Sequence, residues 1–357
     1  MKQAVIGLLY GDEGKGITTS FLSQNKPMAT VIRSNGGHQA GHTVQYKGFR
    51  HVFSQFGSGT LQSTPTFISK NCTIYPPAIL KEYSLIEQYK PILMVDPLAM
   101  ITTPFDIGQN RILEQINKHG SVGVGFGQTI QRNEDNYKLF AQDLYHKDIF
   151  KTKLYNIATM YYSTSVPETL SVMDAFWYQC QRLIEGGFFY ITSWNDINKP
   201  YADLIFESAQ GILLDMDFGF FPHVTRSNTT SKNIIEMAPD LDEVYYITRT
   251  YQTRHGNGPM TNEDKPVPVL DMKNGDETNK FGEYQGKFRI TQLDPNLLNY
   301  SLQCDSNFLP SKVKKNLVVT CFDQHKIDIA SLINRLDVSF DNVYISHGPE
   351  CKTFKKY

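Results

Sequence analysis

The pattern of apolar residues limits the fold of this chain more than any other feature. Its apolar runs are short and continuous rather than alternating, and helical patterns separate them. Such runs occur at residues 4–9, 29–33, 92–95, 188–191, 204–206, 244–248, 317–322 and 343–346. Continuous apolarity predicts strands that are buried on both faces, as in a parallel sheet. Helical patterns lie between them at 79–89, 107–118, 172–185 and 327–336. We therefore predict an α/β fold with a large, mostly parallel central sheet and helices on both faces.

The chain is long enough for one large α/β domain or for two smaller ones. The chain has 357 residues, of which 40% are hydrophobic, and it shows no internal repeat and no low-complexity linker. We expect residues 1–357 to form a single domain. Segments rich in glycine and asparagine, at 121–136, 225–233, 253–263 and 273–289, are predicted to be long loops. Loops of this length in a compact domain usually bind a ligand or a partner.

Charge and cysteine usage argue against several classes of protein. The net charge is −1, so there is no overall basic field to attract nucleic acid. The five cysteines form no CxxC pair and no metal-like spacing with histidine, which favours reduced thiols in a cytoplasmic protein. The apolar run at 4–9 is too short to span a bilayer, and no cleavage site follows it, so we expect no membrane association.

The segment Gly11-Asp12-Glu13-Gly14-Lys15-Gly16 follows the first predicted strand and precedes a predicted helix. Its glycines let backbone N–H groups turn toward a phosphate, the helix N-terminus favours an anion, and Lys15 adds a positive charge. The turn is shorter than a Walker A loop and carries two carboxylates. A carboxylate beside phosphate would repel it unless it binds a metal or accepts a proton. The segment therefore predicts a nucleotide-phosphate loop with a chemical role for Asp12; the alternative is an ordinary acidic turn.

A second glycine-rich segment spans residues 34–43 and reads Ser-Asn-Gly-Gly-His-Gln-Ala-Gly-His-Thr. Its small residues indicate close approach of the backbone to a ligand. A histidine in such a loop can stabilise negative charge on a phosphoryl group in transfer. Zinc binding by His38 and His42 is the alternative. Neither a carboxylate nor a cysteine lies nearby in the sequence, and the glycines oppose a helix, so zinc is disfavoured.

These two segments, and six further ones in the same order, carry a resemblance to the adenylosuccinate synthetase family. The further segments lie at 121–127, 207–215, 222–230, 253–259, 320–323 and 346–349. Each motif is modest alone, but the set in order is specific, and it covers residues 1 to about 350. The resemblance implies a P-loop-like GTP-binding fold with long active-site loops.

The resemblance also implies an activity. It would be the GTP-dependent ligation of L-aspartate to C6 of IMP, through a 6-phosphoryl intermediate, to give adenylosuccinate for purine nucleotide biosynthesis. Mg²⁺ would assist, and the protein would be a homodimer. The implied catalytic residues are Asp12, His42 and Gln210. Asp12 would accept the N1 proton of the purine and contact Mg²⁺ together with the carbonyl of Gly41, while His42 would support the phosphoryl group.

The resemblance assigns binding residues to each substrate. GTP would be bound by Glu13, Gly14, Lys15, Gly16, Gly41, His42, Thr43, Asp323, Ser346, Gly348 and Pro349. The purine nucleotide would be bound by Asp12, Gln39, Ser121, Val122, Gln210, Thr225 and, from a partner subunit, Arg132. L-Aspartate would be bound by Arg254, Lys287 and Arg289. A carboxylate such as Asp323 accepts from both N1–H and N2–H of guanine, which adenine does not offer, so GTP is expected rather than ATP.

The chain departs from the family pattern in ways that leave two alternatives open. Ile17 and Cys321 stand where lysines are expected, and Gly286 and Phe288 where arginines are expected. The first alternative is a phage-type enzyme that ligates aspartate to dGMP, giving N6-succino-2-amino-deoxyadenylate for 2-aminoadenine DNA. Many such enzymes lack the catalytic aspartate and use ATP, so Asp12 and Asp323 favour IMP and GTP. The second is a non-catalytic nucleotide-binding regulator.

Overall fold

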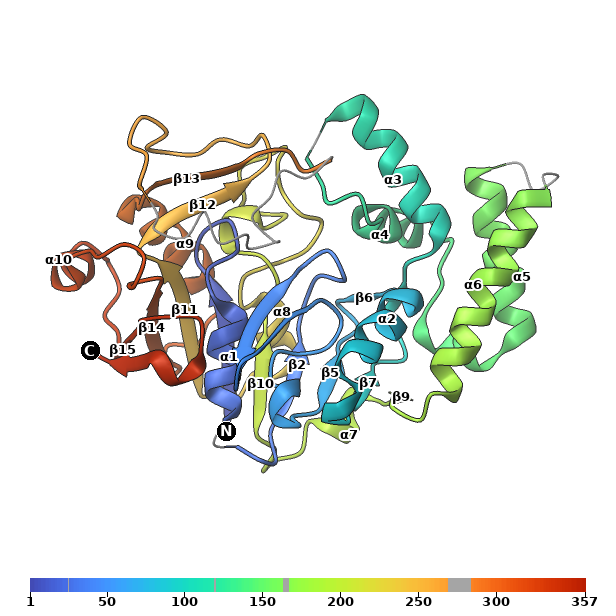
Figure 1. Ribbon diagram of the computed structural model, residues 1–357, viewed down its shortest axis with the longest axis horizontal. Helices are drawn as coiled ribbons and strands as arrows, with labels where there is room; N and C mark the ends of the chain where they lie inside the picture. Colours follow the sequence, from blue (N-terminus) through green and yellow to red (C-terminus); the bar gives the residue numbers. More distant parts are fainter. Residues whose placement is uncertain (25, 119, 163–166, 269–283) are drawn as a thin grey trace.

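The computed structural model describes residues 1–24, 26–118, 120–162, 167–268 and 284–357, and a single large sheet runs through it (Figure 1). The strand order is β16-β15-β14-β11-β1-β10-β2-β5-β7-β9. From one edge to the other the bounds are Phe354–Lys356, Asn342–Ser346, Lys314–Thr320, Glu243–Arg249, Lys2–Gly7, Leu204–Glu207, Thr30–Arg33, Thr66–Ile68, Leu93–Val95 and Phe189–Ile191. All neighbouring pairs are parallel except β15 and β16. The predicted parallel sheet is confirmed.

Helices and small two-stranded sheets surround the large sheet. The helices are α1 Lys15–Ser23, α2 Pro76–Ile86, α3 Pro104–Asn117, α4 Phe126–Glu134, α5 Lys147–Tyr161, α6 Pro167–Glu185, α7 Trp194–Ile197, α8 Lys232–Met237, α9 Pro295–Ser306 and α10 Ile329–Asn334. The two-stranded sheets pair β3 His42–Tyr46 with β4 Phe49–Phe53, β6 Thr73–Ile74 with β8 Met100–Ile101, and β12 Tyr251–His255 with β13 Phe288–Gln292.

Alternate residues of the central strand β1 are buried on opposite faces of the sheet. Ala4 and Ile6 pack in a cluster that includes residues of α8, α9 and α10, whereas Val5 packs with Leu22 of α1. Both faces of a parallel strand therefore exclude water, which explains why its sequence is continuously apolar. Helices on both faces are thus confirmed.

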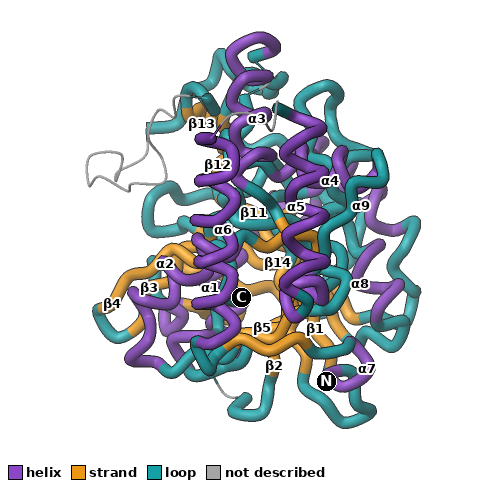
Figure 2. Tube along the Cα trace, turned by 90° about the vertical axis from the view of Figure 1, so that its right-hand side faces the viewer, coloured by secondary structure: helices purple, strands orange, loops and turns teal. Residues whose placement is uncertain are grey.

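A further apolar cluster fills the end of the sheet formed by β5, β7 and β9. It joins these strands to α2, α5 and α6, and the last two helices contact each other. Figures 1 and 2 show α5 and α6 side by side, and Figure 1 shows them at the side of the molecule away from the C-terminal strands. Among the described helices, none is both long and apolar enough to cross a bilayer.

The loop predictions were right in part. Residues 126–134 lie inside the predicted loop 121–136 but form α4. The last two residues of the predicted loop 273–289 belong to β13. Residues 273–283 of that segment lie outside the described residues. The polar sequence of α4 gives little apolar signal, and its ordering depends on α3, which packs against it. Such tertiary support is invisible to local patterns.

The order of the strands gathers the loops that carry the motifs. The chain runs outward from β1 through β2, β5, β7 and β9, and then returns to place β10 and β11 on either side of β1. In open parallel sheets ligands bind outside the carboxyl ends of the strands where the order reverses. The loops after β1, β2 and β10, with those after β11 and β14, therefore meet at one edge.

Candidate active site

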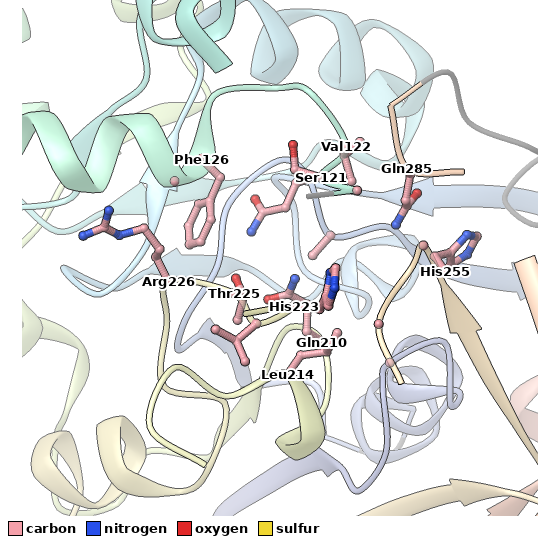
Figure 3. Close-up of a pocket in the computed structure, with 18 of the residues that line it drawn as sticks. Ser121, Val122, Phe126, Gln210, Leu214, His223, Thr225, Arg226, His255 and Gln285 are labelled. Carbon is pink, nitrogen blue, oxygen red and sulfur yellow. The ribbon is translucent and has the colours of Figure 1, made fainter. Parts of the chain in front are cut away.

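A cavity of about 830 Å³ lies at this edge and is lined by residues from most of the motif segments. They include Asp12, Lys15, Gln39, Gly41, His42, Ser121, Val122, Gln210, Thr225 and Arg254. Figure 3 shows Ser121, Val122 and Phe126 on one side of it and Gln210, Leu214 and Thr225 on the opposite side. Segments far apart in sequence thus converge on a single hollow.

The loop after β1 turns through the left-handed region before α1 begins. Gly11, Asp12 and Gly14 have φ values of 93°, 58° and 97°. Glu13 folds beneath the loop, where its Oε1 accepts the N–H of Leu9 at 2.6 Å, and it does not line the cavity. Burial raises the pKa of Glu13 to about 7, although the charge of Lys15 opposes this shift. The Glu13 carboxylate therefore supports the loop, and any contact of this residue with phosphate would be through its backbone.

Asp12 presents its side chain to the cavity. Its Oδ2 lies 2.9 Å from Nε2 of His255, and 33% of the side chain is exposed. Its carbonyl accepts a hydrogen bond from Arg249. Burial alone would raise the pKa of Asp12, but the hydrogen bond from His255 and the charges of His255, Arg249 and Lys15 outweigh it, so the pKa lies below its ordinary value. The carboxylate is therefore ionised at neutral pH.

His42 forms a buried pair with Glu207, a residue to which the sequence analysis gave no role. Nδ1 of His42 lies 2.8 Å from Glu207 Oε1, and Glu207 Oε2 accepts the N–H of Ser58 at 3.1 Å. Burial would raise the pKa of Glu207, but His42, Arg33 and the Ser58 hydroxyl lower it to about 2. Burial lowers the pKa of His42 below its ordinary value, and Glu207 offsets that shift only in part. An ionised carboxylate on Nδ1 fixes the ring and stabilises an imidazolium, as in other His–carboxylate pairs.

Several buried polar atoms beside the cavity lack a hydrogen-bond partner within the described part of the chain. These atoms are Nε2 of His42, Oε1 of Gln210, and both amide atoms of Gln39. Gln210 is held with φ 63°, and Asn35 exchanges two hydrogen bonds with the preceding Ala209. Buried polar groups are normally paired, so these atoms mark where a polar ligand fits.

The opposite wall is built by α3 and the loop that follows it. Glu114 accepts the N–H groups of Gly120 and Ser121 at 2.9 and 3.1 Å, and Asn110 accepts that of Gly125 at 2.9 Å. Gly125, with φ 85°, then starts α4. Ser121 and Val122 are thus held at the rim of the cavity by polar side chains of α3.

Arg132 is not placed as the sequence analysis expected. Its side chain is fully buried, and its guanidinium donates to Asp106 at 2.8 Å and to the carbonyl of Ile101 at 2.7 Å. It does not line the cavity and faces the interior of its own subunit, so the expectation that it reaches a partner's nucleotide is wrong. α4 begins after Gly125 and turns this residue inward, which the sequence did not indicate.

Replacing Arg132 by Met is expected to lower the free energy of unfolding by about 3–5 kcal/mol, because the buried Asp106 would lose its charge partner. Arg226→Met is the matched control. The Arg226 side chain is 42% exposed and pairs with an exposed Glu134, so its loss should cost less than about 1 kcal/mol. Denaturant unfolding measures both, and equal losses would contradict the structural role of Arg132.

The residues assigned to L-aspartate are mostly engaged with the protein itself. Arg254 and Arg289 face each other across β12 and β13. Arg254 lies 4.2 Å from the ring centre of Tyr10 and donates to two backbone carbonyls, and Arg289 pairs with Glu263. Lys287 is exposed and does not line the cavity. Arg254 does line it, and its Nε has no partner among the described residues.

The residues assigned to the guanine base lie at the ends of β14 and β15, to one side of the phosphate loop. The Thr320 hydroxyl donates to the carbonyl of Glu13 at 2.8 Å, which joins β14 to that loop. Ser346 donates to the carbonyl of Gly348 at 2.9 Å, and Asp323 is exposed to solvent. A base bound here would lie beyond the phosphates, outside the cavity itself.

His38 and His42 have different neighbours, which does not favour a shared zinc ion. His38 stacks on Tyr75, with ring centres 5.0 Å apart, whereas His42 is held by Glu207. Among the described residues, no three histidine, cysteine, aspartate or glutamate side chains gather as a metal cluster.

The sequence matches a family model described as adenylosuccinate synthetase over residues 4–330. The adenylosuccinate synthetase of Wigglesworthia glossinidia brevipalpis is 33% identical over 327 residues, covering 85% of this chain and 74% of that protein. That of Lactobacillus acidophilus is 32% identical over 305 residues, covering 79% of this chain and 68% of that protein.

Two solved structures share the fold. A fully ligated adenylosuccinate synthetase from Plasmodium falciparum has a TM-score of 0.80 at 17% identity, covering 100% of this chain and 99% of that one. The succinoaminodeoxyadenylate synthetase of cyanophage S-2L, bound to dGMP and dATP, has a TM-score of 0.69 at 14% identity, covering 99% and 94%. At these identities the likeness shows the fold alone.

Proposed function

Because the chain belongs to the adenylosuccinate synthetase family of ligases, which form a carbon–nitrogen bond, we propose that it joins L-aspartate to C6 of IMP using GTP. The observation that carries this proposal is that Asp12, His42 and Gln210 line one cavity, with Glu207 behind His42 and with the amide oxygen of Gln210 lacking a partner among the described residues. A base, a histidine held for donation to a phosphoryl group, and an amide at one place suit the activation and replacement of a purine 6-oxygen.

In the first step Asp12 accepts the proton from N1 of IMP, which makes O6 nucleophilic. O6 attacks the γ-phosphorus of GTP, the bond from that phosphorus to the β–γ bridging oxygen breaks, and GDP leaves with the electron pair. His42 donates from Nε2 to the phosphoryl group in transfer, and Lys15 offsets its negative charge. Ionised Glu207 favours the imidazolium form of His42 that makes this donation.

In the second step the amine of L-aspartate attacks C6 and the bond from C6 to the phosphorylated oxygen breaks. The departing phosphate takes back the proton held by Asp12, and the amine nitrogen releases one proton to solvent. Gln210 suits this exchange because its amide can donate to an oxygen and accept from an N–H. Arg254, through its unpartnered Nε, is the described residue that we assign to a carboxylate of the amino acid.

The residues present also fit Mg²⁺. Asp12 and the backbone of Gly41 line the same cavity, and a carboxylate and a carbonyl are hard oxygen donors. Mg²⁺ is commonly bound by one or two protein oxygens together with substrate phosphates, so a larger protein cluster is not required. We propose that Asp12 and Gly41 hold it, where it would neutralise charge on the GTP phosphates.

The dGMP reaction is the second candidate, because guanine also carries the N1–H and O6 that Asp12 and Gln210 would address. The purified protein, L-aspartate, Mg²⁺ and GTP are incubated with IMP or with dGMP, and the succinylated nucleotide is measured by chromatography. Product from IMP at a much higher kcat/KM supports the proposal, and a preference for dGMP overturns the choice of purine. Product from neither nucleotide would favour a regulator.

Asp323→Asn is expected to reduce the preference for GTP over ATP roughly 5- to 150-fold, because losing the paired guanine donors costs about 1–3 kcal/mol. The ratio of kcat/KM values for the two triphosphates measures it. Asp148→Asn, which alters another exposed carboxylate, is the control and should leave the ratio unchanged. An unchanged ratio in Asp323→Asn would remove this residue from guanine recognition.

We also propose that the protein is a cytoplasmic homodimer, as the family resemblance implies. With Arg132 buried in its own subunit, a partner would have to supply a different residue to the nucleotide.

A further inference from the structure

His255 is held at the rim of the cavity by the end of β12. It pairs with Phe288 of β13, and the two rings lie 4.6 Å apart between centres. The next residue, Gly256, has φ 80° and donates its N–H to the carbonyl of Lys287 at 3.1 Å. Figure 3 places His255 beside Gln285, on the side of the cavity away from Arg226. The imidazole therefore has a defined position before any ligand binds.

The hydrogen bond of this imidazole is made with Asp12. Nε2 lies 2.9 Å from Asp12 Oδ2, and the His255 side chain is 15% exposed. Nδ1 is buried and has no hydrogen-bond partner in the part of the chain that the structure describes. A carboxylate oxygen at that distance accepts a hydrogen bond, so Nε2 carries the proton and donates it.

Two cationic side chains also act on the Asp12 carboxylate. Lys15 and Arg249 both lie close enough for their charges to act on it. Lys15 belongs to the phosphate loop, and Arg249 already binds the Asp12 carbonyl. If the carboxylate turned toward Lys15, the base and the phosphate-binding cation would neutralise each other. The hydrogen bond from Nε2 of His255 to Oδ2 of Asp12 opposes this rotation.

We propose that His255 is a positioning residue for Asp12, holding one carboxylate oxygen so that the other faces N1 of the purine. This inference rests on the proposed function for its kinetic consequence, whereas the contact itself can be tested without substrate. The resemblance to the family implied no role for this histidine.

The kinetic test compares three replacements of His255. Gln places its amide nitrogen where Nε2 stands, Asn places it where Nδ1 stands, and Leu offers no donor. We expect His255→Leu and His255→Asn to lower kcat roughly 10- to 100-fold with little change in KM for the nucleotide, because a misplaced base costs rate rather than binding. His255→Gln should recover most of the rate. His146→Gln, at an exposed histidine, is the control.

Two further measurements separate positioning from a general loss of structure. In an Asp12→Asn background, adding His255→Leu should lower the residual rate no further, because both changes remove the same function, proton acceptance by a positioned Asp12. Proton NMR of the metal-free protein without nucleotide should show a low-field Nε2–H resonance of His255 that is lost in Asp12→Ala.

The outcomes are decisive in each arm. The inference is overturned if all three replacements have the wild-type rate. It is also overturned if the losses add in the double variant, or if Asp12→Ala leaves the His255 resonance unchanged. If the wild-type protein forms no succinylated product, the proposed function fails, and the NMR comparison still decides whether His255 holds Asp12.

Discussion

Replacing Asp12 by Asn is expected to lower kcat for ligation roughly 10²- to 10⁴-fold, the range that a positioned general base contributes. The amide keeps the shape of the side chain but cannot accept the N1 proton, so O6 stays a weak nucleophile. Nucleotide binding should change little, because Gln39, Gln210 and Thr225 still line the cavity. Steady-state assays give kcat, and calorimetry gives the affinity for the monophosphate.

The control is Asp174→Asn. Asp174 is a residue of α6 whose side chain is 74% exposed and which does not line the cavity. It should behave as wild type. An Asp12→Asn protein that turns over at the wild-type rate would rule out the base, whereas one that no longer binds nucleotide would point to a structural role instead.

Replacing His42 by Asn is expected to lower kcat roughly 10²- to 10³-fold, as when one donor to a developing negative charge is removed. The Asn amide can still donate to Glu207, so the buried carboxylate keeps a partner, but nothing replaces Nε2 at the cavity. The change therefore removes Nε2 of His42 while keeping a hydrogen bond to Glu207. Steady-state kinetics with saturating GTP measure it, beside a thermal unfolding curve.

Glu207→Gln is the companion to His42→Asn. It keeps the shape of the pair but removes the charge that favours the imidazolium, so kcat should fall while KM for GTP changes little. A normal kcat in both variants would show that the phosphoryl group is supported elsewhere. His146→Asn, at an exposed histidine, controls for the loss of an imidazole as such.

The strands and the glycine-rich turn before α1 were predictable because their signals are local. A strand buried on both faces needs consecutive apolar residues, and the runs at 4–9 and 244–248 became β1 and β11. A tight turn before a helix needs glycine at positive φ, and Gly11 and Gly14 have it. α4 was missed because a short polar helix depends on its tertiary neighbours more than on its own residues.

The residues of the candidate site also fall into those that the sequence predicted and those that it did not. The motifs named Asp12, His42 and Gln210, which the structure brings to one cavity. Arg132 was misjudged because its sequence position said nothing about Asp106, which buries its charge. Glu207 stood at the end of a strand within a motif, and a charged residue following a buried strand was the signal that would have singled it out.

The α/β architecture, the glycine-rich turn before α1 and the chemical types of residue available follow from the sequence alone, because they depend on apolar periodicity and turn chemistry among near neighbours. The tertiary structure decided which of these residues act together. Glu207 meets His42 across 165 residues, and His255 reaches Asp12 from a separate two-stranded sheet. Such contacts follow from the strand order, which places β10 and β11 beside β1, and no local pattern encodes that order.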